Sequence, residues 1–93
     1  MTAADEATRW VFEHWGDRFA AERLIMLFMA QHCERNGDGW VATPKNMDIV
    51  EWTGVSPRHL RVCLGTLVAD GLLKKEHRPT GADSRWVYHF GSS

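Results

Sequence analysis

The chain has 93 residues, which suits one compact domain and excludes two. Hydrophobic residues make up 44% of it, including five Trp and four Phe, which excludes a disordered chain. Eleven basic against twelve acidic residues give a net charge of -1, so bulk positive charge does not attract this protein to nucleic acid. Two cysteines exclude a disulfide framework, and the longest apolar run, Leu24 to Ala30, is too short for a membrane span. We expect a cytoplasmic protein.

The N-terminal segment, residues 3 to 15, predicts a short amphipathic helix that ends near Gly16. Trp10, Val11 and Trp15 recur there at helical spacing. Two uses of this apolar face remain open: the helix closes the core of its own chain, or it docks against a second copy and forms a homodimer. Residues 1–16 therefore form a packing or dimerisation helix, and residues 17–91 form the main domain.

A second helix is predicted from an N-cap at Asp17 to about Arg35, where Asn36-Gly37 supplies stop residues. The run from Leu24 to Ala30 leaves no polar stripe through two turns. A helix that is apolar all round must be covered on more than one side. We expect the rest of the domain to cover one side and the N-terminal helix to cover the other.

Two helices in the middle of the chain begin with the same signal, a hydroxyl side chain followed by proline. Thr43-Pro44 predicts a helix to about Thr53, and Ser56-Pro57 predicts another that runs to Asp70. Gly54 lies between them and allows a sharp reversal of the chain. The two helices therefore form a helix-turn-helix.

The segments on either side of these helices predict extended structure. Trp40 and Val41 form a short extended piece before the first of them. Leu72 to His77 and Trp86 to Phe90 are typical of strands, and a polar, turn-rich segment separates them. The fold class expected is mainly α with a small β-hairpin.

The order helix, short strand, helix, helix, strand, wing, strand is that of a winged helix-turn-helix. Residues 18 to 77 resemble the winged-helix domains of bacterial transcription regulators of the MarR and GntR kind. They also resemble the small helix-turn-helix domains of actinobacterial plasmid and phage replication proteins. The resemblance rests on Gly39-Trp40 before Thr43-Pro44, on Thr53-Gly54-Val55-Ser56-Pro57-Arg58, and on Leu64-x-x-Leu67-Val68-x-x-Gly71-Leu72-Leu73.

This resemblance implies a three-helix core plus a wing, with an extra N-terminal helix. It implies a protein without a cofactor that binds double-stranded DNA as a transcription regulator or a replication-control factor. The helix from Pro57 would lie in the major groove, where Arg58 and Arg61 suit guanine or phosphate. The DNA-binding residues so implied are Thr43, Lys45, Asn46, Ser56, Pro57, Arg58, His59, Arg61, Val62, Thr66, Lys74, Lys75, Arg78 and Arg85.

The spacing of apolar residues predicts which face of the helix from Pro57 is buried. Leu60, Cys63, Leu64 and Leu67 share that face. The distribution of charge along the chain favours DNA binding by the opposite, outward face of this helix. From Met1 to Glu51 there are five basic and nine acidic residues, whereas the rest of the chain has six basic and three acidic ones. Positive charge therefore gathers in the half that holds the predicted recognition helix and wing.

Val62 and Gly65 leave a second function open. They stand on the outer face of the helix, where relatives commonly carry basic or polar residues. Val62 could contact a thymine methyl group, but an exposed Val beside a Gly is also typical of a protein-binding surface. The alternative is a winged helix that acts as an adaptor or inhibitor through protein–protein interaction, without binding DNA.

The sequence predicts neither a metal site nor an enzyme. On a helix, His32 and Cys33 would point about 100° apart, so they cannot easily share one ion. Cys33 and Cys63 are expected to be small core residues. Glycine-rich phosphate loops and catalytic signatures are missing from the sequence. Trp52 lies off the apolar stripe of its helix, and we expect it to pack on the N-terminal helix or to face a partner.

Overall fold

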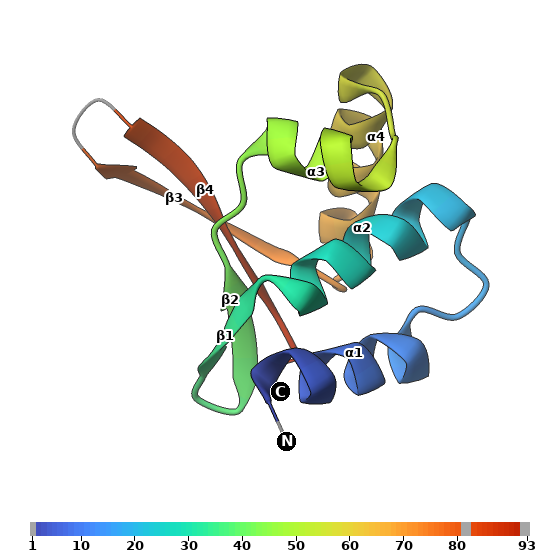
Figure 1. The fold of residues 1–93 in the computed structure, drawn as a ribbon, viewed down its shortest axis with the longest axis vertical. Coiled ribbons are helices and arrows are strands. Elements are labelled where there is room, and N and C mark those ends of the chain that lie inside the picture. The colour runs from blue at the N-terminus through green and yellow to red at the C-terminus, as the bar shows by residue number, and fades with distance from the viewer. Residues whose placement is uncertain (1, 81–82, 92–93) are drawn as a thin grey trace.

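The computed structural model describes the backbone of residues 2–80 and 83–91, and the side chains of these residues outside 77–85. Within this part the protein has an α+β architecture with four helices and one four-stranded antiparallel sheet of order β1-β2-β4-β3 (Figure 1). The helices are α1 (Ala3–His14), α2 (Ala20–Gln31), α3 (Asn46–Thr53) and α4 (Pro57–Ala69). The strands are β1 (Cys33–Asn36), β2 (Gly39–Ala42), β3 (Lys74–Thr80) and β4 (Asp83–Phe90).

The helices form two groups along the molecule. Figure 1 shows α1 beneath α2 at the bottom and α3 with α4 at the top, where the β3–β4 hairpin projects to the side. α2 contacts α1 on one side and α3 and α4 on the other. The expectation that α2 is covered on more than one side is therefore confirmed. In the described ranges no helix combines the length and the apolar character that crossing a membrane requires.

The predicted N-terminal helix is confirmed as α1. The Thr2 hydroxyl accepts a hydrogen bond from the Asp5 backbone N–H at 3.1 Å, and the Asp5 carboxylate accepts one from the Thr2 N–H at 3.4 Å. This capping box satisfies two N–H groups at the start of the helix. Ala7 and Val11 are fully buried in the core, so α1 closes the core of its own chain.

The predicted bounds of the second helix are wrong at both ends. α2 begins at Ala20 after Phe19, whose side chain makes no cap, and Asp17 has no capping role. The helix ends at Gln31, because the next residues form β1 instead. Asn36 pairs with Gly39 across a two-residue loop, so the Asn-Gly signal that predicted a helix stop belongs to a hairpin.

The two proline signals have different outcomes. Ser56-Pro57 starts α4 as predicted, since the Ser56 hydroxyl accepts a hydrogen bond from the His59 backbone N–H at 3.2 Å. The prediction from Thr43-Pro44 is wrong by two residues, because α3 begins at Asn46. Lys45 is the N-cap residue and has an extended backbone, so Thr43 caps nothing.

The sheet is larger than the small hairpin that was predicted. β3 starts at Lys74, after the buried Leu72 and Leu73, and its pairing with β4 continues to Thr80 opposite Asp83. β2 pairs with β4, which places Trp40 opposite Phe90, and β1 adds an edge strand. The predicted core face of α4 is confirmed, because Leu60, Cys63, Leu64 and Leu67 are all buried.

Candidate nucleic-acid interface

The reversal between α3 and α4 is held by hydrogen bonds within the chain. Gly54 ends α3 with a φ of 75°, in the left-handed region that favours glycine. The Thr53 hydroxyl donates to the Ile49 carbonyl at 2.7 Å and accepts from the Val55 N–H at 3.2 Å. Val55 is buried between the two helices and the core, so the start of α4 has a fixed direction.

The outer face of α4 is open to solvent along its length. Arg58, His59, Arg61, Val62, Gly65 and Thr66 are all exposed, as predicted. At its start the exposed Ser56 hydroxyl uses an oxygen lone pair for the cap, so its own hydrogen is still available to donate. Pro57 has no N–H, and the His59 and Leu60 N–H groups donate to Ser56, so the Arg58 N–H is the backbone donor of this first turn that stands beside the hydroxyl.

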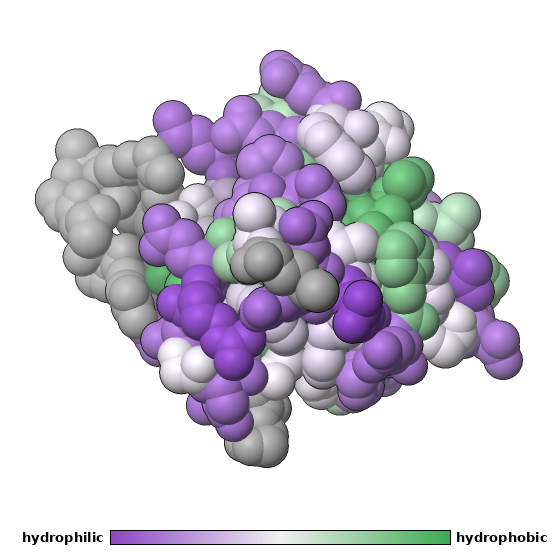
Figure 2. Space-filling model, turned by 60° about the horizontal axis from the view of Figure 1, so that its bottom comes forward, coloured by the Kyte–Doolittle hydropathy of each residue, from purple (hydrophilic) through white to green (hydrophobic). Residues whose placement is uncertain are grey.

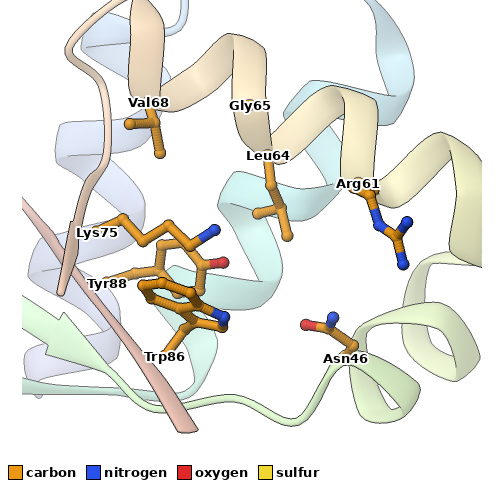
Figure 3. Close-up of a pocket in the computed structure, with 8 residues that line it drawn as sticks. All are labelled: Asn46, Arg61, Leu64, Gly65, Val68, Lys75, Trp86 and Tyr88. Carbon is orange, nitrogen blue, oxygen red and sulfur yellow. The ribbon is translucent and has the colours of Figure 1, made fainter. Parts of the chain in front are cut away.

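A hollow of about 480 Å³ lies between α4, the start of α3 and the β3–β4 hairpin (Figure 3). Three predicted DNA-binding residues, Asn46, Arg61 and Lys75, lie around it. Figure 3 shows the Arg61 and Asn46 side chains directed toward the same space from two helices. The remaining lining residues are Leu64, Gly65, Val68, Trp86 and Tyr88.

Trp86 lines this hollow, although it is not among the residues predicted to bind DNA. Its ring is 41% exposed, and the Lys75 ammonium lies 3.9 Å from the ring centroid. This is a cation–π contact, which holds the ammonium in place while leaving it charged. Alternation along β4 puts Trp86, Tyr88 and Phe90 on one face, and that period was the signal that could have revealed it.

Tyr88 lies deeper in the same wall and is only 1% exposed. Burial raises the pKa of its hydroxyl above the ordinary 10.0, because removal from water penalises the phenolate. Tyr88 therefore stays neutral at physiological pH. It adds a polar edge to the hollow without adding charge.

Three cations on this face are not paired with any described acidic residue. Among the described residues, Lys45, Arg58 and Arg61 have no acidic partner at ion-pair distance. Arg18 provides the contrast, since its guanidinium lies 3.0 Å from Glu22 and 2.9 Å from Asp70. Burial opposes the charge of Arg18, but hydrogen bonds to Asp70 and Glu22 raise its pKa. Arg18 is thus a structural cation, whereas the cations of the α4 face are available to a ligand.

Comparisons with models of protein families, with curated proteins and with solved structures found no match.

The structure separates other predicted residues from the hollow. Lys74 pairs with His89 and Lys75 with Tyr88, so the two lysines lie on opposite faces of the sheet. The Thr66 hydroxyl donates to the Val62 carbonyl at 3.2 Å, and Thr66 lines a different hollow with Asp70. Thr43 is exposed in the link between β2 and α3. Arg78 and Arg85 pair across the hairpin, and their side chains lie outside the described residues.

The residues assigned to packing or dimerisation mostly serve the chain's own core. Val11 is fully buried, and Trp10 is half-buried with its ring centroid 6.2 Å from that of Trp40. Trp15 is half-buried beneath the Arg23 guanidinium, which lies 5.1 Å from its ring. Trp52 packs on α2 rather than on α1, so that part of the prediction is wrong.

The expectation that His32 and Cys33 lie on one helix is wrong. His32 is the residue that ends α2, and Cys33 begins β1, where it is half-buried rather than a core residue. Cys63 is buried as predicted, and burial raises the pKa of its thiol. Across the described ranges, no three His, Cys, Asp or Glu residues lie close enough together to hold a metal ion.

Proposed function

We propose that this protein binds duplex DNA and acts as a transcription regulator or a replication-control factor. The observation that carries the proposal is the face made by α4 and the hairpin. There, Arg58, Arg61 and Lys75 are exposed and have no acidic partner among the described residues. A ligand with regularly spaced negative charges and a groove for a helix complements that face.

The chain order supports a winged helix-turn-helix as the fold. α2 precedes β2, the pair α3 and α4 follows, and β3 and β4 form a hairpin that pairs with β2 through β4. The hairpin would be the wing, and α4 would be the recognition helix. α1 and β1 are then additions to this core, at the side away from the proposed interface (Figure 1).

The dimensions of α4 suit the major groove. An α-helix with its side chains is about 10–12 Å across and the groove is about 12 Å wide, so one helix enters it, and the 13 residues of α4 supply about 20 Å of length along it. Arg58 and Arg61 would then reach guanine edges or phosphates. The Ser56 hydroxyl and the Arg58 N–H would bind a phosphate oxygen, and Lys45 and Lys75 would neutralise flanking phosphates.

Affinity for duplex DNA across a range of salt concentrations tests this proposal. Four described cations, Lys45, Arg58, Arg61 and Lys75, face the ligand in this arrangement. Neutralising four phosphates predicts a slope of about -3.6 in a plot of log affinity against log salt. Saturable binding with a slope near this value supports the proposal. No binding to mixed-sequence duplexes at low salt overturns it.

We also propose that two copies bind paired half-sites. Exposed aromatic rings near the junction of α1 and α2 support this, since Phe12 is 54% exposed and Phe19 is 80% exposed. Figure 2 shows the face that carries α1, on which green apolar side chains gather toward the right. Large apolar side chains that are exposed on a surface are typical of association surfaces. A light-scattering mass equal to one chain at micromolar concentration would contradict the dimer.

One observation favours protein binding without DNA as a second candidate. Val62 is a large apolar side chain on the outer face of α4, and it is 63% exposed. A partner protein that covers Val62 would lose affinity on Val62→Asp. The same substitution in a DNA-binding protein weakens DNA binding, because it places a carboxylate beside phosphates. Recovery of a partner protein with the wild type but not with Val62→Asp, together with no binding of duplex DNA by the wild type, would favour this second function.

A further inference from the structure

A second hollow, of about 330 Å³, lies between α2 and α3 and shares no lining residue with the proposed DNA interface. Its volume is at the lower end of small-ligand sites, which are roughly 300–1,000 Å³. Three aromatic rings and two carboxylates line it: Phe28 and His32 from the end of α2, and Asp48, Glu51 and Trp52 from α3.

The three rings form a corner. Phe28 and His32 stack with centroids 4.2 Å apart and an interplanar angle of 24°. Trp52 stands across both of them, at 72° to Phe28 and 88° to His32. Trp52 is 47% exposed, so much of its indole is left to contact a ligand. Aromatic faces that meet at a right angle surround a small ligand from two sides.

The polar groups around this corner are anionic or hydrogen-bond acceptors. Asp48 and Glu51 are three residues apart on α3, so they lie on neighbouring positions of one helix face. Both are exposed, and neither has a basic partner at ion-pair distance among the described residues.

His32 contributes an acceptor to the same corner. Its Nδ1 lies 3.0 Å from the Phe28 carbonyl oxygen, which can only accept a hydrogen bond. Nδ1 must therefore carry the proton, and Nε2 of the neutral ring is left as an acceptor.

We propose that this hollow binds an arginine or lysine side chain from a basic segment of a partner protein. Aromatic faces attract cations through their quadrupole, and the two carboxylates supply charge complementarity. The lining residues other than Phe28 are exposed, which lets the end of a long side chain enter while its backbone stays outside. The proposal does not depend on DNA binding, because the two sites use different residues and different signs of charge.

An NMR titration of the full-length, ¹⁵N-labelled protein tests it, with the Trp52 indole N–H as the probe. The ligand is a short acetylated Gly-Arg-Gly peptide, and the matched control replaces arginine with citrulline, a neutral side chain of nearly the same shape. A saturable shift with arginine and none with citrulline is expected. Equal shifts with the two peptides would overturn the proposal.

Two double variants that neutralise charge without changing side-chain shape separate a loss of binding from a loss of folding. Asp48→Asn/Glu51→Gln keeps the shape of the hollow and should weaken binding about three- to tenfold. Glu13→Gln/Glu34→Gln makes the same change in net charge at exposed positions elsewhere and should leave binding unchanged. Equal loss in the two variants contradicts a specific site. Tighter binding of tetramethylammonium than of the arginine peptide overturns the assignment to a partner segment.

Discussion

Arg61→Ala should lower the salt dependence of DNA binding without unfolding the protein. Arg61 is exposed on α4, lines the hollow with Asn46 and Lys75, and has no acidic partner among the described residues. Its removal leaves no buried charge unpaired, so stability should change by less than about 0.5 kcal/mol. One of four cations on the face is lost, and the slope should change from about -3.6 to about -2.7.

The size of this change is measurable. Between 50 and 200 mM salt, a slope of -3.6 means that affinity falls about 150-fold, whereas a slope of -2.7 means about 40-fold. If Arg61 contacts a guanine edge, affinity for the preferred sequence falls by a further 1–3 kcal/mol or so, and discrimination at that base pair relaxes.

Fluorescence anisotropy of a labelled duplex, titrated at four salt concentrations, measures both effects. The matched control is Arg9→Ala, which removes the same charge from an exposed position on α1, at the opposite end of the molecule (Figure 1). Arg9→Ala should keep the wild-type slope. If the two variants lower the slope equally, the protein interacts through its overall charge, and the assignment of the interface to α4 and the hairpin is refuted.

Three further predictions concern the fold that positions this face. Gly91→Ala should unfold at a lower urea concentration than Gly16→Ala. Both glycines have positive φ, so both variants are strained, but at Gly91 the added Cβ would also overlap the Trp40 ring. That overlap should lower the free energy of unfolding by about 1–3 kcal/mol more. Equal losses would contradict that packing. Tyr88→Phe should reduce the loss of stability above pH 10. The raised pKa of the buried Tyr88 means that the folded protein keeps this proton at a pH where the unfolded chain releases it, which favours unfolding in the wild type. Urea unfolding from pH 9 to 11 measures this, and identical pH profiles of variant and wild type would contradict it. Arg18→Ala should lower the free energy of unfolding by about 1–3 kcal/mol, because it leaves the buried Glu22 carboxylate without its partner. Arg35→Ala breaks a half-exposed pair with Glu6 and should lower it by less than about 1 kcal/mol. Thermal unfolding measures both losses, and a larger loss for Arg35→Ala would refute the difference.

Features set by a few neighbouring residues were predictable from the sequence. Ser56-Pro57 starts α4, Gly54 ends α3, and the apolar spacing from Leu60 to Leu67 gives the buried face of α4. Each depends on backbone groups within a turn or two, so the local sequence contains the physical cause. The exposed face of α4 follows from the same period, which is why its arginines were identified correctly as exposed.

Features that depend on distant pairing were not predictable. Asn36-Gly37 stops a helix as readily as it turns a hairpin, and the pairing of β1 with β2 decided for the hairpin. Thr43-Pro44 has the chemistry of a helix start, but the extended path from β2 delayed α3 to Asn46. In both cases a strand elsewhere in the chain outweighed the local preference.

The sequence by itself determined which side chains of α4 are charged and exposed, since charge and helical period are local properties. Only the tertiary structure decided which of them act together. The positions of α3 and α4 relative to the β3–β4 hairpin bring Asn46, Arg61 and Lys75 around one hollow and add Trp86. The pleat of β3 sends Lys74 to the opposite face, and the turn of α4 puts Thr66 beside Asp70. A site made of residues up to 40 positions apart is fixed by how the elements pack, and no single stretch of sequence specifies that packing.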